Sequence, residues 1–565
     1  MKRLLMPLVL GGVALVVLTV AAGAANQAQP THKWKFPPTI TAPWVAEGEE
    51  EGEFEPPDAA AGLCRSAPFN TTAVYAPLAP NVDAIVGDPV NNSGFSNFGC
   101  TTPQNETTIA VNPTNPQNLV AGANDYRVCC DFTGLNDATG GAYYSFDGGA
   151  HWGNVQLPGL TFQTDADANL KRIDAAGDPV VAFGADGTVY YANIVFSRVS
   201  PVSGVVVSTS HDGGRSWSDP NVVTFTGAGN FIHDKEWIAA GPDGKVVVTW
   251  TRFNLGPRGA GFLESPIVGA FSKDGGKTWN RQSFPISDGA HPFDQGSQVA
   301  YGPDGALYVA YEAASPTTGY RTDALVLARS TNDGLTFETK ELARVYDDPD
   351  CYPIFAGSQT LSDMHFRLNS YPSLSIDPSN ATIAIAWSDD QGGGTCGSGG
   401  TTFSGTTSNQ VKLVRGTWAT IGSAPVVPVT TSAPDKVFPS VAARGGKLAV
   451  TYYTRDYAIG SAAAICHVRT NDNPTQIPPT PSANSVCIDY AAKSATSTGS
   501  FGSEVRLSSE SSNPYVQFAD GSFIGDYSQV AIASNGTAYG AWTDFRGNPG
   551  VTPANQDVVV QSFTP

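Results

Sequence analysis

The side chains best suited to chemistry in this 565-residue chain stand at the ends of apolar segments. Arginine suits the binding of carboxylates and sugar hydroxyls, because its planar guanidinium presents donors in a fixed fork. Carboxyl and phenol groups can transfer protons or act as nucleophiles once burial and neighbouring charges tune their pKa values. The candidate substrate-binding residues are Arg127, Arg252, Arg455 and Arg546, and the candidate catalytic residues are Asp178, Glu236, Glu312, Asp526 and Tyr527.

A role follows for each catalytic candidate from its chemistry. Tyr527 is the candidate nucleophile, with Tyr371 as the alternative. Glu236 or Glu312 would assist that nucleophile, and the two aspartates of the set would transfer protons. The competing interpretation is that these acids and arginines pair only with one another and with backbone amides.

One repeating unit must position these side chains. Seven segments share an apolar strand, a turn usually built on Gly, Asp or Asn, and a second strand rich in β-branched and aromatic residues. The spacing averages about 70 residues, which is enough for a four-stranded sheet with its loops. Aligned on the turn, the first strands place an apolar residue at one equivalent position: Ile109, Val181, Ile238, Val299, Leu374, Val441 and Val530.

The repeat predicts an all-β protein. Because the paired strands are apolar almost throughout, both faces of each sheet must be covered, as they are when blades stack around an axis. We expect a β-propeller of four-stranded antiparallel blades, seven in number, with six as the alternative. The last unit ends after 557–563, one strand short of a blade, so an N-terminal strand is expected to complete it. In such a ring the candidate side chains share one rim.

A second motif occurs in the first four units, in segments that begin at Ser145, Ser210, Ser272 and Ser330. Its pattern is Ser-x-Asp-x-Gly-x-Thr-Trp, relaxed in the fourth copy to Asn332 and Phe337. The Ser and Asp side chains can bond amides of a tight turn, the glycines can supply positive φ, and the Trp can pack between sheets. These residues are therefore expected to stabilise the fold and not to catalyse.

This motif resembles the bacterial neuraminidase repeat, or Asp-box, and over residues 100–565 the chain resembles the secreted sialidase-like propeller superfamily. In sialidases of that superfamily three arginines hold the substrate carboxylate, a Tyr paired with Glu is the nucleophile, and an Asp handles the proton. The resemblance implies an exo-α-sialidase-like glycoside hydrolase that acts on terminal acidic sugars of glycans. A non-catalytic propeller that binds glycan or protein is the alternative, because one fold hosts many functions.

The N-terminal region predicts export. Lys2 and Arg3 precede an apolar stretch that closes on small residues, so 1–25 is expected to be a signal peptide, with an uncleaved anchor as the alternative. Residues 26–80 form an acidic, proline-rich leader, and 81–565 form a single propeller domain. We expect a secreted protein, extracellular or periplasmic, with no membrane association after cleavage.

The net charge bears on the possible binding partners, and the cysteines bear on disulfide bonds. A formal net charge of -19 disfavours nucleic acid. The resemblance to the sialidase-like superfamily implies a glycan or glycoconjugate as the partner, and we expect a monomer. Eight cysteines in an exported chain indicate disulfides. Cys351 with Cys396 and Cys466 with Cys487 are sequence neighbours that could pair.

No cofactor is expected. The sequence lacks the His-Glu-x-x-His of zinc peptidases and the Gly-x-Ser-x-Gly of serine hydrolases. Residues 165–169 open like a calcium loop, but Leu170 stands where that loop requires glycine. A solvated loop is the prediction there, and calcium is the alternative.

Overall fold

A computed structural model describes the chain in segments between Asn81 and Pro565. The described residues are 81–84, 103–128, 137–167, 170–227, 229–256, 262–280, 282–319, 322–347, 352–355, 358–362, 364–390, 407–432, 434–457, 487–509, 511, 514, 523–545 and 556–565. The predicted signal peptide and leader lie outside these residues, as do all the cysteines except Cys487. Within the described part, no helix has the length and apolar character needed to cross a membrane.

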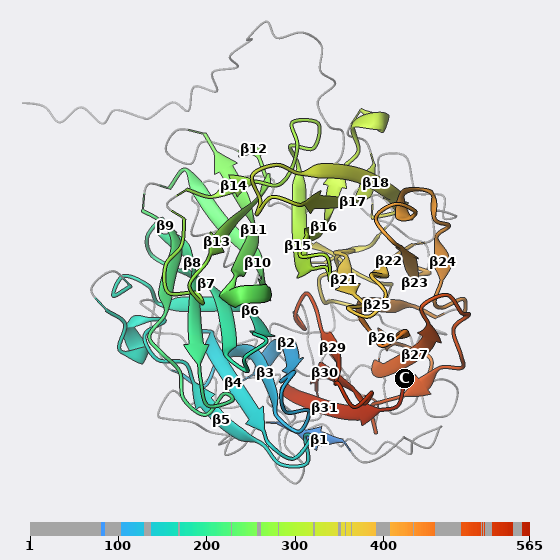
Figure 1. Cartoon of the computed structure of the whole chain (residues 1–565), viewed down its shortest axis with the longest axis horizontal. Coiled ribbons are helices and arrows are strands. Elements are labelled where there is room, and N and C mark those ends of the chain that lie inside the picture. The colour runs from blue at the N-terminus through green and yellow to red at the C-terminus, as the bar shows by residue number, and fades with distance from the viewer. Residues whose placement is uncertain are drawn as a thin grey trace, which may run out of the picture.

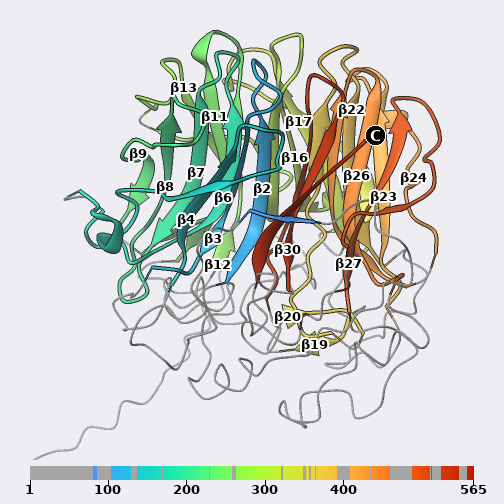
Figure 2. The same ribbon diagram turned by 90° about the horizontal axis from the view of Figure 1, so that it is seen from below.

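Seven antiparallel sheets stand as blades around one axis (Figure 1). Each blade has four strands in its main path, and the innermost strands of neighbouring blades contact one another around the ring. The predicted seven-bladed propeller is therefore confirmed. The strands run roughly along the axis (Figure 2).

The first four blades follow the chain from the axis outward. Blade 1 contains β2 (Gln104–Val111), β3 (Leu119–Asp125), β4 (Thr139–Ser145) and β5 (Gly153–Gln156). Blade 2 contains β6 (Ala175–Phe183), β7 (Val189–Phe196), β8 (Ser203–Ser210) and β9 (Asn221–Thr226). Blade 3 contains β10 (Phe231–Ala240), β11 (Val246–Leu255), β13 (Ile267–Ser272) and β14 (Phe284–Pro285), and β12 (Phe262–Glu264) pairs with β11. Blade 4 contains β15 (Asp294–Tyr301), β16 (Leu307–Ala314), β17 (Asp323–Ser330) and β18 (Glu338–Val345).

An insertion separates blade 4 from the last three blades. It carries the short hairpin β19 (Ile354–Phe355) and β20 (Ser358–Gln359), which lies beyond one end of the ring (Figure 2). Blade 5 contains β21 (Ser373–Ile376), β22 (Ile383–Asp389), β23 (Gln410–Gly416) and β24 (Val427–Pro428). Blade 6 contains β25 (Lys436–Arg444), β26 (Lys447–Thr454), β27 (Asp489–Thr496) and β28 (Val505–Arg506). Blade 7 contains β29 (Gln529–Ile532), β30 (Ala538–Asp544), β31 (Asp557–Phe563) and β1 (Val82–Asp83). Four single 3₁₀ turns complete the structure: η2 (Phe162–Thr164), η3 (Pro242–Gly244), η5 (Pro316–Thr318) and η7 (Ile421–Ser423).

The two ends of the described chain close the ring together. Strand β1 pairs with β31, and the Ala84 amide donates to the Val558 carbonyl at 2.9 Å. The Asn81 side chain donates to the Leu507 carbonyl of blade 6 at 2.7 Å. The N-terminal strand thus completes the last blade, as the sequence predicted. This closure pairs an edge that would otherwise be open to association.

Apolar side chains fill the spaces between blades. Seven hydrophobic clusters lie one at each interface between neighbours, which explains why both faces of the strands are apolar. Trp250, Trp387 and Trp542, on the second strands of blades 3, 5 and 7, are at most 2% exposed. The insertion adds five apolar side chains to the cluster between blades 6 and 7: Tyr352, Leu361, Met364, Phe366 and Leu368.

Four turns between the third and fourth strands share one hydrogen-bond pattern. The Ser272 hydroxyl donates to the Asp274 carboxylate at 2.8 Å and accepts from the Gly276 amide at 2.9 Å. Asp274 in turn accepts from the Thr278 amide at 2.9 Å. The same bonds recur in the turns that begin at Ser145, Ser210 and Ser330. The expected turn geometry is confirmed, and these side chains hold the turns.

Bulges interrupt the innermost strands close to the axis. The pairing of β2, β6, β10, β15 and β25 with their partners slips by a residue at an equivalent place. The bulge contains Glu106, Asp178, Lys235, Gly296 or Phe438, and φ at these residues lies between 49° and 67°. For residues other than glycine this conformation costs about 1–3 kcal/mol each, and it persists only where surrounding contacts enforce it. The bulges therefore mark the axis as a place where local strain is held.

Loss of β1 should destabilise the whole ring. We expect a chain that begins at residue 85 to unfold at a lower temperature than one that begins at residue 61, because only the shorter chain lacks β1 and exposes the edge of β31. Differential scanning calorimetry and light scattering of the two proteins measure unfolding and aggregation. Equal melting temperatures would show that β1 contributes nothing to closure.

Candidate functional site

Seven side chains occupy one equivalent position around the axis, three residues before the aligned apolar residue of each unit. They are Glu106, Asp178, Lys235, Gly296, Tyr371, Phe438 and Tyr527. The first three carry ionisable carboxyl or amino groups, and the other four are one glycine and three aromatic residues. The ring around the axis is therefore divided into a charged half, in blades 1 to 3, and an aromatic half, in blades 4 to 7.

The Lys235 ammonium is the centre of the charged half. Its Nζ lies 3.0 Å from an Asp178 oxygen, 2.9 Å from an Asp526 oxygen and 3.4 Å from Glu106 Oε1. These four side chains are at most 5% exposed. An ammonium has three donors, so three carboxyl groups saturate it.

Further hydrogen bonds fix the carboxyl groups of this cluster. The Asn124 amide donates to Glu106 Oε2 at 3.0 Å, and the Asp526 amide donates to Glu106 Oε1 at 3.1 Å. Arg367, from the insertion before blade 5, binds both oxygens of Asp526 at 2.9 and 2.6 Å. The cluster therefore joins blades 1, 2, 3 and 7 and the insertion.

Burial and charge set the protonation of these groups in opposite directions. Burial, and next the Asp178 carboxylate, raise the pKa of Glu106 well above its usual value. Burial acts to raise the pKa of Asp526 as well, but the Arg367 and Lys235 charges outweigh it and hold that pKa below its usual range. Burial would lower the pKa of Lys235, yet the surrounding carboxylates keep it well above its usual value. These shifts favour the charged forms of Lys235 and Asp526 and the protonated form of Glu106.

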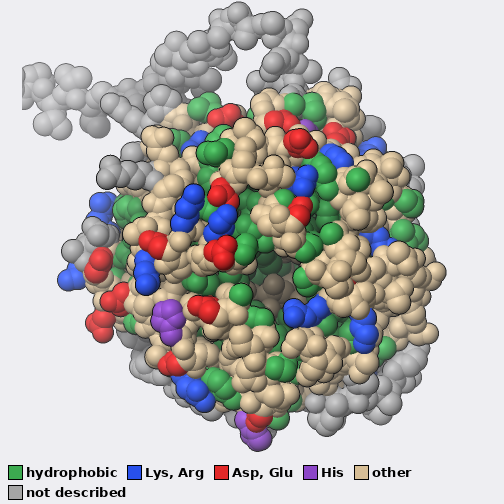
Figure 3. Space-filling view, viewed as in Figure 1, with side chains coloured by type: hydrophobic (Ala, Val, Ile, Leu, Met, Phe, Trp, Pro, Cys, Tyr) green, Lys and Arg blue, Asp and Glu red, His purple; other side chains and the backbone are tan. Residues whose placement is uncertain are grey.

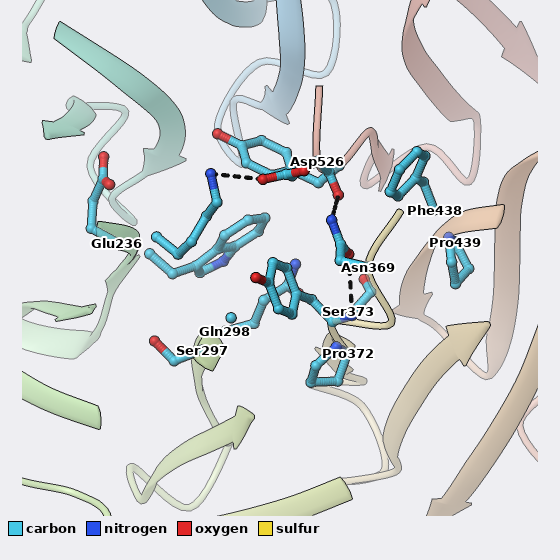
Figure 4. A pocket seen from close by; sticks show the side chains of 14 residues that line it. Glu236, Ser297, Gln298, Asn369, Pro372, Ser373, Phe438, Pro439 and Asp526 are labelled. Carbon is cyan, nitrogen blue, oxygen red and sulfur yellow. Dashed lines mark hydrogen bonds and ion pairs between the residues drawn. The ribbon is translucent and has the colours of Figure 1, made fainter. Parts of the chain in front are cut away.

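A pocket lies against this cluster, on the axis. Lys235, Glu236 and Asp526 line it. Figure 4 shows Glu236 well apart from Asp526, with its carboxyl group not directed toward it. Neutral polar residues contribute Ser297, Gln298, Asn369 and Ser373. The face of the ring seen in Figure 3 is hollowed at its centre, in line with the axis.

Aromatic side chains form much of the wall. The Trp237 and Tyr527 rings meet edge to face, with centroids 5.6 Å apart, and the Tyr527 hydroxyl donates to the Pro179 carbonyl at 2.9 Å. The Tyr371 ring packs against Gly296, where a Cβ atom would lie 2.3 Å from the ring. Glycine at 296 thus permits both the positive φ of the bulge and the close approach of Tyr371.

Glu236 differs from the other acids of the site. Its side chain is buried, and neither carboxyl oxygen receives a hydrogen bond from another described residue. Burial, and next the Asp178 carboxylate, raise the pKa of Glu236 well above its usual value, which favours its protonated form. Glu236 is therefore a buried carboxyl group beside the pocket with a raised pKa.

The structure brings together four of the five predicted catalytic residues. Glu236, Asp526 and Tyr527 line the pocket, and Asp178 binds Lys235 beside it. Glu312 lies apart from them, on β16, where it pairs across the sheet with Gln295, and it does not line the pocket.

The predicted arginines are not brought together. Arg127 binds Asp125 at 2.6 Å, Arg252 donates to Asn254 Oδ1 at 2.9 Å, and Arg455 donates to Asp435 at 2.9 Å. None of these three lines the pocket, and Arg546 lies outside the described residues. Their predicted role as a substrate clamp stays a prediction.

Sequence analysis assigned no role to Glu106, Lys235 or Arg367. The register of the repeat could have indicated the first two, because Glu106, Asp178 and Lys235 each precede the aligned apolar residue by three positions. Nothing in the repeat indicates Arg367, since it belongs to the insertion. In the part of the chain that the structure describes, no group of His, Cys, Asp or Glu side chains is arranged to hold a metal ion. Residues 168 and 169 of the calcium alternative are not described.

No protein-family model and no curated protein matches this chain. Solved structures that resemble it include an α-L-arabinanase of Penicillium chrysogenum, 15% identical with a TM-score of 0.41, covering 66% of this chain and 93% of that one. A Hadza microbial sialidase is 12% identical with a TM-score of 0.40, covering 79% and 73%. A Trypanosoma rangeli sialidase is 14% identical with a TM-score of 0.36, covering 69% and 58%. These neighbours are glycosidases with a propeller fold, and at such values the likeness carries no argument about this chain's activity.

Removing the central ammonium should destabilise the fold strongly. We expect Lys235→Met to lower the free energy of unfolding by about 3–5 kcal/mol, because it leaves buried carboxylates without their cation. Lys245→Met is the matched control, since Lys245 pairs with Asp333 at a partly exposed site and should cost at most about 1 kcal/mol. Urea denaturation of both variants measures the difference, and equal effects would contradict a central role for Lys235.

Proposed function

We propose that the protein is a glycoside hydrolase whose active site is the axial pocket. The observation that carries the proposal is that two carboxyl groups line one pocket with pKa values displaced in opposite directions, Glu236 upward and Asp526 downward. Such a divergence separates a general acid from an ionised base or nucleophile. Glu236 is the acid and Asp526 is the carboxylate.

The two groups are linked by a ring contact. Glu236 precedes Trp237, Tyr527 follows Asp526, and the two rings meet at 5.6 Å. Glu236 gives its proton to the glycosidic oxygen as the bond to the sugar carbon breaks. Asp526 either takes a proton from the attacking water or attacks that carbon itself, depending on the separation of the two groups around the sugar. In the second case, a water that gives its proton to Glu236 then breaks the bond between Asp526 and the sugar. One water is consumed, and proton exchange with solvent restores both carboxyl groups.

Two finer features belong to the same proposal. The four Ser-x-Asp or Ser-x-Asn turns make the hydrogen bonds that a bacterial neuraminidase repeat requires, which supports membership of the sialidase-like superfamily. The charged and apolar pattern of 1–25 supports export. The substrate is then a terminal sugar of an extracellular or periplasmic glycan.

A non-catalytic glycan-binding propeller is the second candidate. The observation in its favour is that Arg367 holds both oxygens of Asp526, and Lys235 holds one of them as well. A carboxylate so engaged is a weaker base than a free one. The binder would use the same aromatic wall and neutral side chains without turnover.

Hydrolysis should depend on both carboxyl groups. We expect the purified protein to release aglycone from at least one member of a panel of fluorogenic sialosides, arabinofuranosides and neutral hexosides. Glu236→Gln and Asp526→Asn should each lower kcat/KM by about 10²–10⁴-fold, because each removes a group that transfers a proton or attacks carbon. Glu341→Gln, on the exposed face of outer strand β18, is the control and should leave the rate unchanged.

The pH profile provides a second readout. Only protonated Glu236 can donate, so the rate should fall as pH rises through its raised pKa, at a higher pH than an ordinary glutamate would give. Glu236→Gln should remove this basic limb from the residual activity. Binding of a glycan without release of aglycone, at every pH, would favour the non-catalytic propeller.

A further inference from the structure

We infer that the axial pocket takes an uncharged terminal sugar and discriminates against sugars that carry a carboxylate. This inference names the substrate class of the proposed active site and rests on that site being the binding pocket. It differs from the acidic sugar that the superfamily resemblance implies, because it depends only on the charges and surfaces that line this pocket.

The cations near the pocket are already engaged by carboxyl groups of the protein. The three donors of the Lys235 ammonium face Glu106, Asp178 and Asp526 at 2.9–3.4 Å. Arg367 directs Nε and Nη2 to the two oxygens of Asp526, and it is not among the lining residues. A substrate carboxylate would have to displace one of these internal partners.

The carboxyl groups of the wall add repulsion. Asp526 lines the pocket as an ionised group, held in place by Asn369, whose amide donates to the Asp526 carbonyl at 3.1 Å. A second carboxylate brought into the same buried space would meet like charge at low dielectric constant, where such repulsion is strong. The Asp178 and Asp234 carboxylates beside Lys235 add to this repulsion.

The remaining wall suits an uncharged sugar. Gln298 accepts from the Leu374 amide through Oε1 at 2.7 Å, which leaves its NH₂ group as a neutral donor. At the equivalent ring position, blades 4 to 7 supply Gly296, Tyr371, Phe438 and Tyr527, so this half of the pocket is aromatic. Aromatic faces bury the C–H surface of a sugar ring, and a few neutral polar groups fix its orientation.

The space for the sugar depends on one backbone position. Tyr371 can lie against Gly296 only because that residue has no Cβ, as a Cβ would lie 2.3–2.8 Å from the ring and Cβ atoms of Tyr371. Gly296 therefore sets the place of the Tyr371 ring in the wall. A larger residue at 296 would move that ring into the pocket or away from it.

Matched sugars test the inference on the full chain. Isothermal titration calorimetry at pH 7 would compare methyl glycosides of glucose, galactose and arabinose with those of glucuronic acid, galacturonic acid, glucosamine and galactosamine. We expect at least one neutral glycoside to bind, and its uronic counterpart to bind at least tenfold more weakly. Equal or tighter binding of a uronic acid, tenfold tighter binding of an amino sugar, or no binding of any neutral glycoside would overturn the inference.

Two variants connect the result to the wall. Tyr371→Ala should weaken binding of the neutral glycoside at least tenfold, and Asp526→Asn should narrow the gap between neutral and uronic sugars. Lys245→Met, remote from the pocket, is the control for both, and calorimetric melting shows whether each variant is folded. If a variant does not fold, the comparison of sugars on the unaltered protein decides the matter alone.

Different experimental outcomes would contradict the proposed hydrolysis and the inferred substrate class. Tight binding of neutral sugars with no release of aglycone would leave the substrate class standing and remove hydrolysis. Release of aglycone from sialosides or uronides, and not from neutral glycosides, would keep hydrolysis and remove the substrate class.

Discussion

The ammonium of Lys235 binds carboxyl groups from three other parts of the ring, and much of the axis is arranged around that contact. Glu106 comes from blade 1, Asp178 from blade 2 and Asp526 from the segment before blade 7. A buried charge is tolerated only when it is paired, so these carboxyl groups and their cation require one another. The same contact fixes Asp526 at the edge of the pocket, so the stability of the ring and the chemistry of the pocket depend on one set of atoms.

The strained bulges explain how the side chains of Glu106, Asp178 and Lys235 come to point toward the axis. A strand that remained regular would direct its side chains into the spaces between blades, where Val181, Ile238 and their equivalents pack. The extra residue of each bulge breaks that alternation and turns one side chain toward the axis. Positive φ at Glu106, Asp178 and Lys235 is therefore balanced by the ion pairs that these residues make.

The architecture could be predicted from the sequence because the repeat consists of apolar strands and turn-forming residues. Both determine the backbone locally. It predicted seven blades, the shared last blade and the hydrogen bonds of the Ser-x-Asp turns. It also placed all the candidate side chains on one rim, and of these Glu236, Asp526 and Tyr527 line the pocket. The arginines were harder, because a guanidinium at a strand end can bind a neighbour of its own blade, as Arg127 binds Asp125. The direction of the Lys235 side chain is set by a bulge, and the position of Arg367 is set by an insertion. The sequence repeat shows neither effect.

The pairing of β1 with β31 also limits the order in which the strands can form during synthesis and folding. Val82 meets Val560 across nearly the whole length of the sequence, so the first strand has no partner until the last one exists. Contacts between such distant residues form slowly, since the entropy of closing the intervening loop must be overcome first. During synthesis from the N-terminus, β1 therefore stays unpaired while the first six blades form. A chain whose synthesis stops before β31 cannot complete the last blade or close the ring.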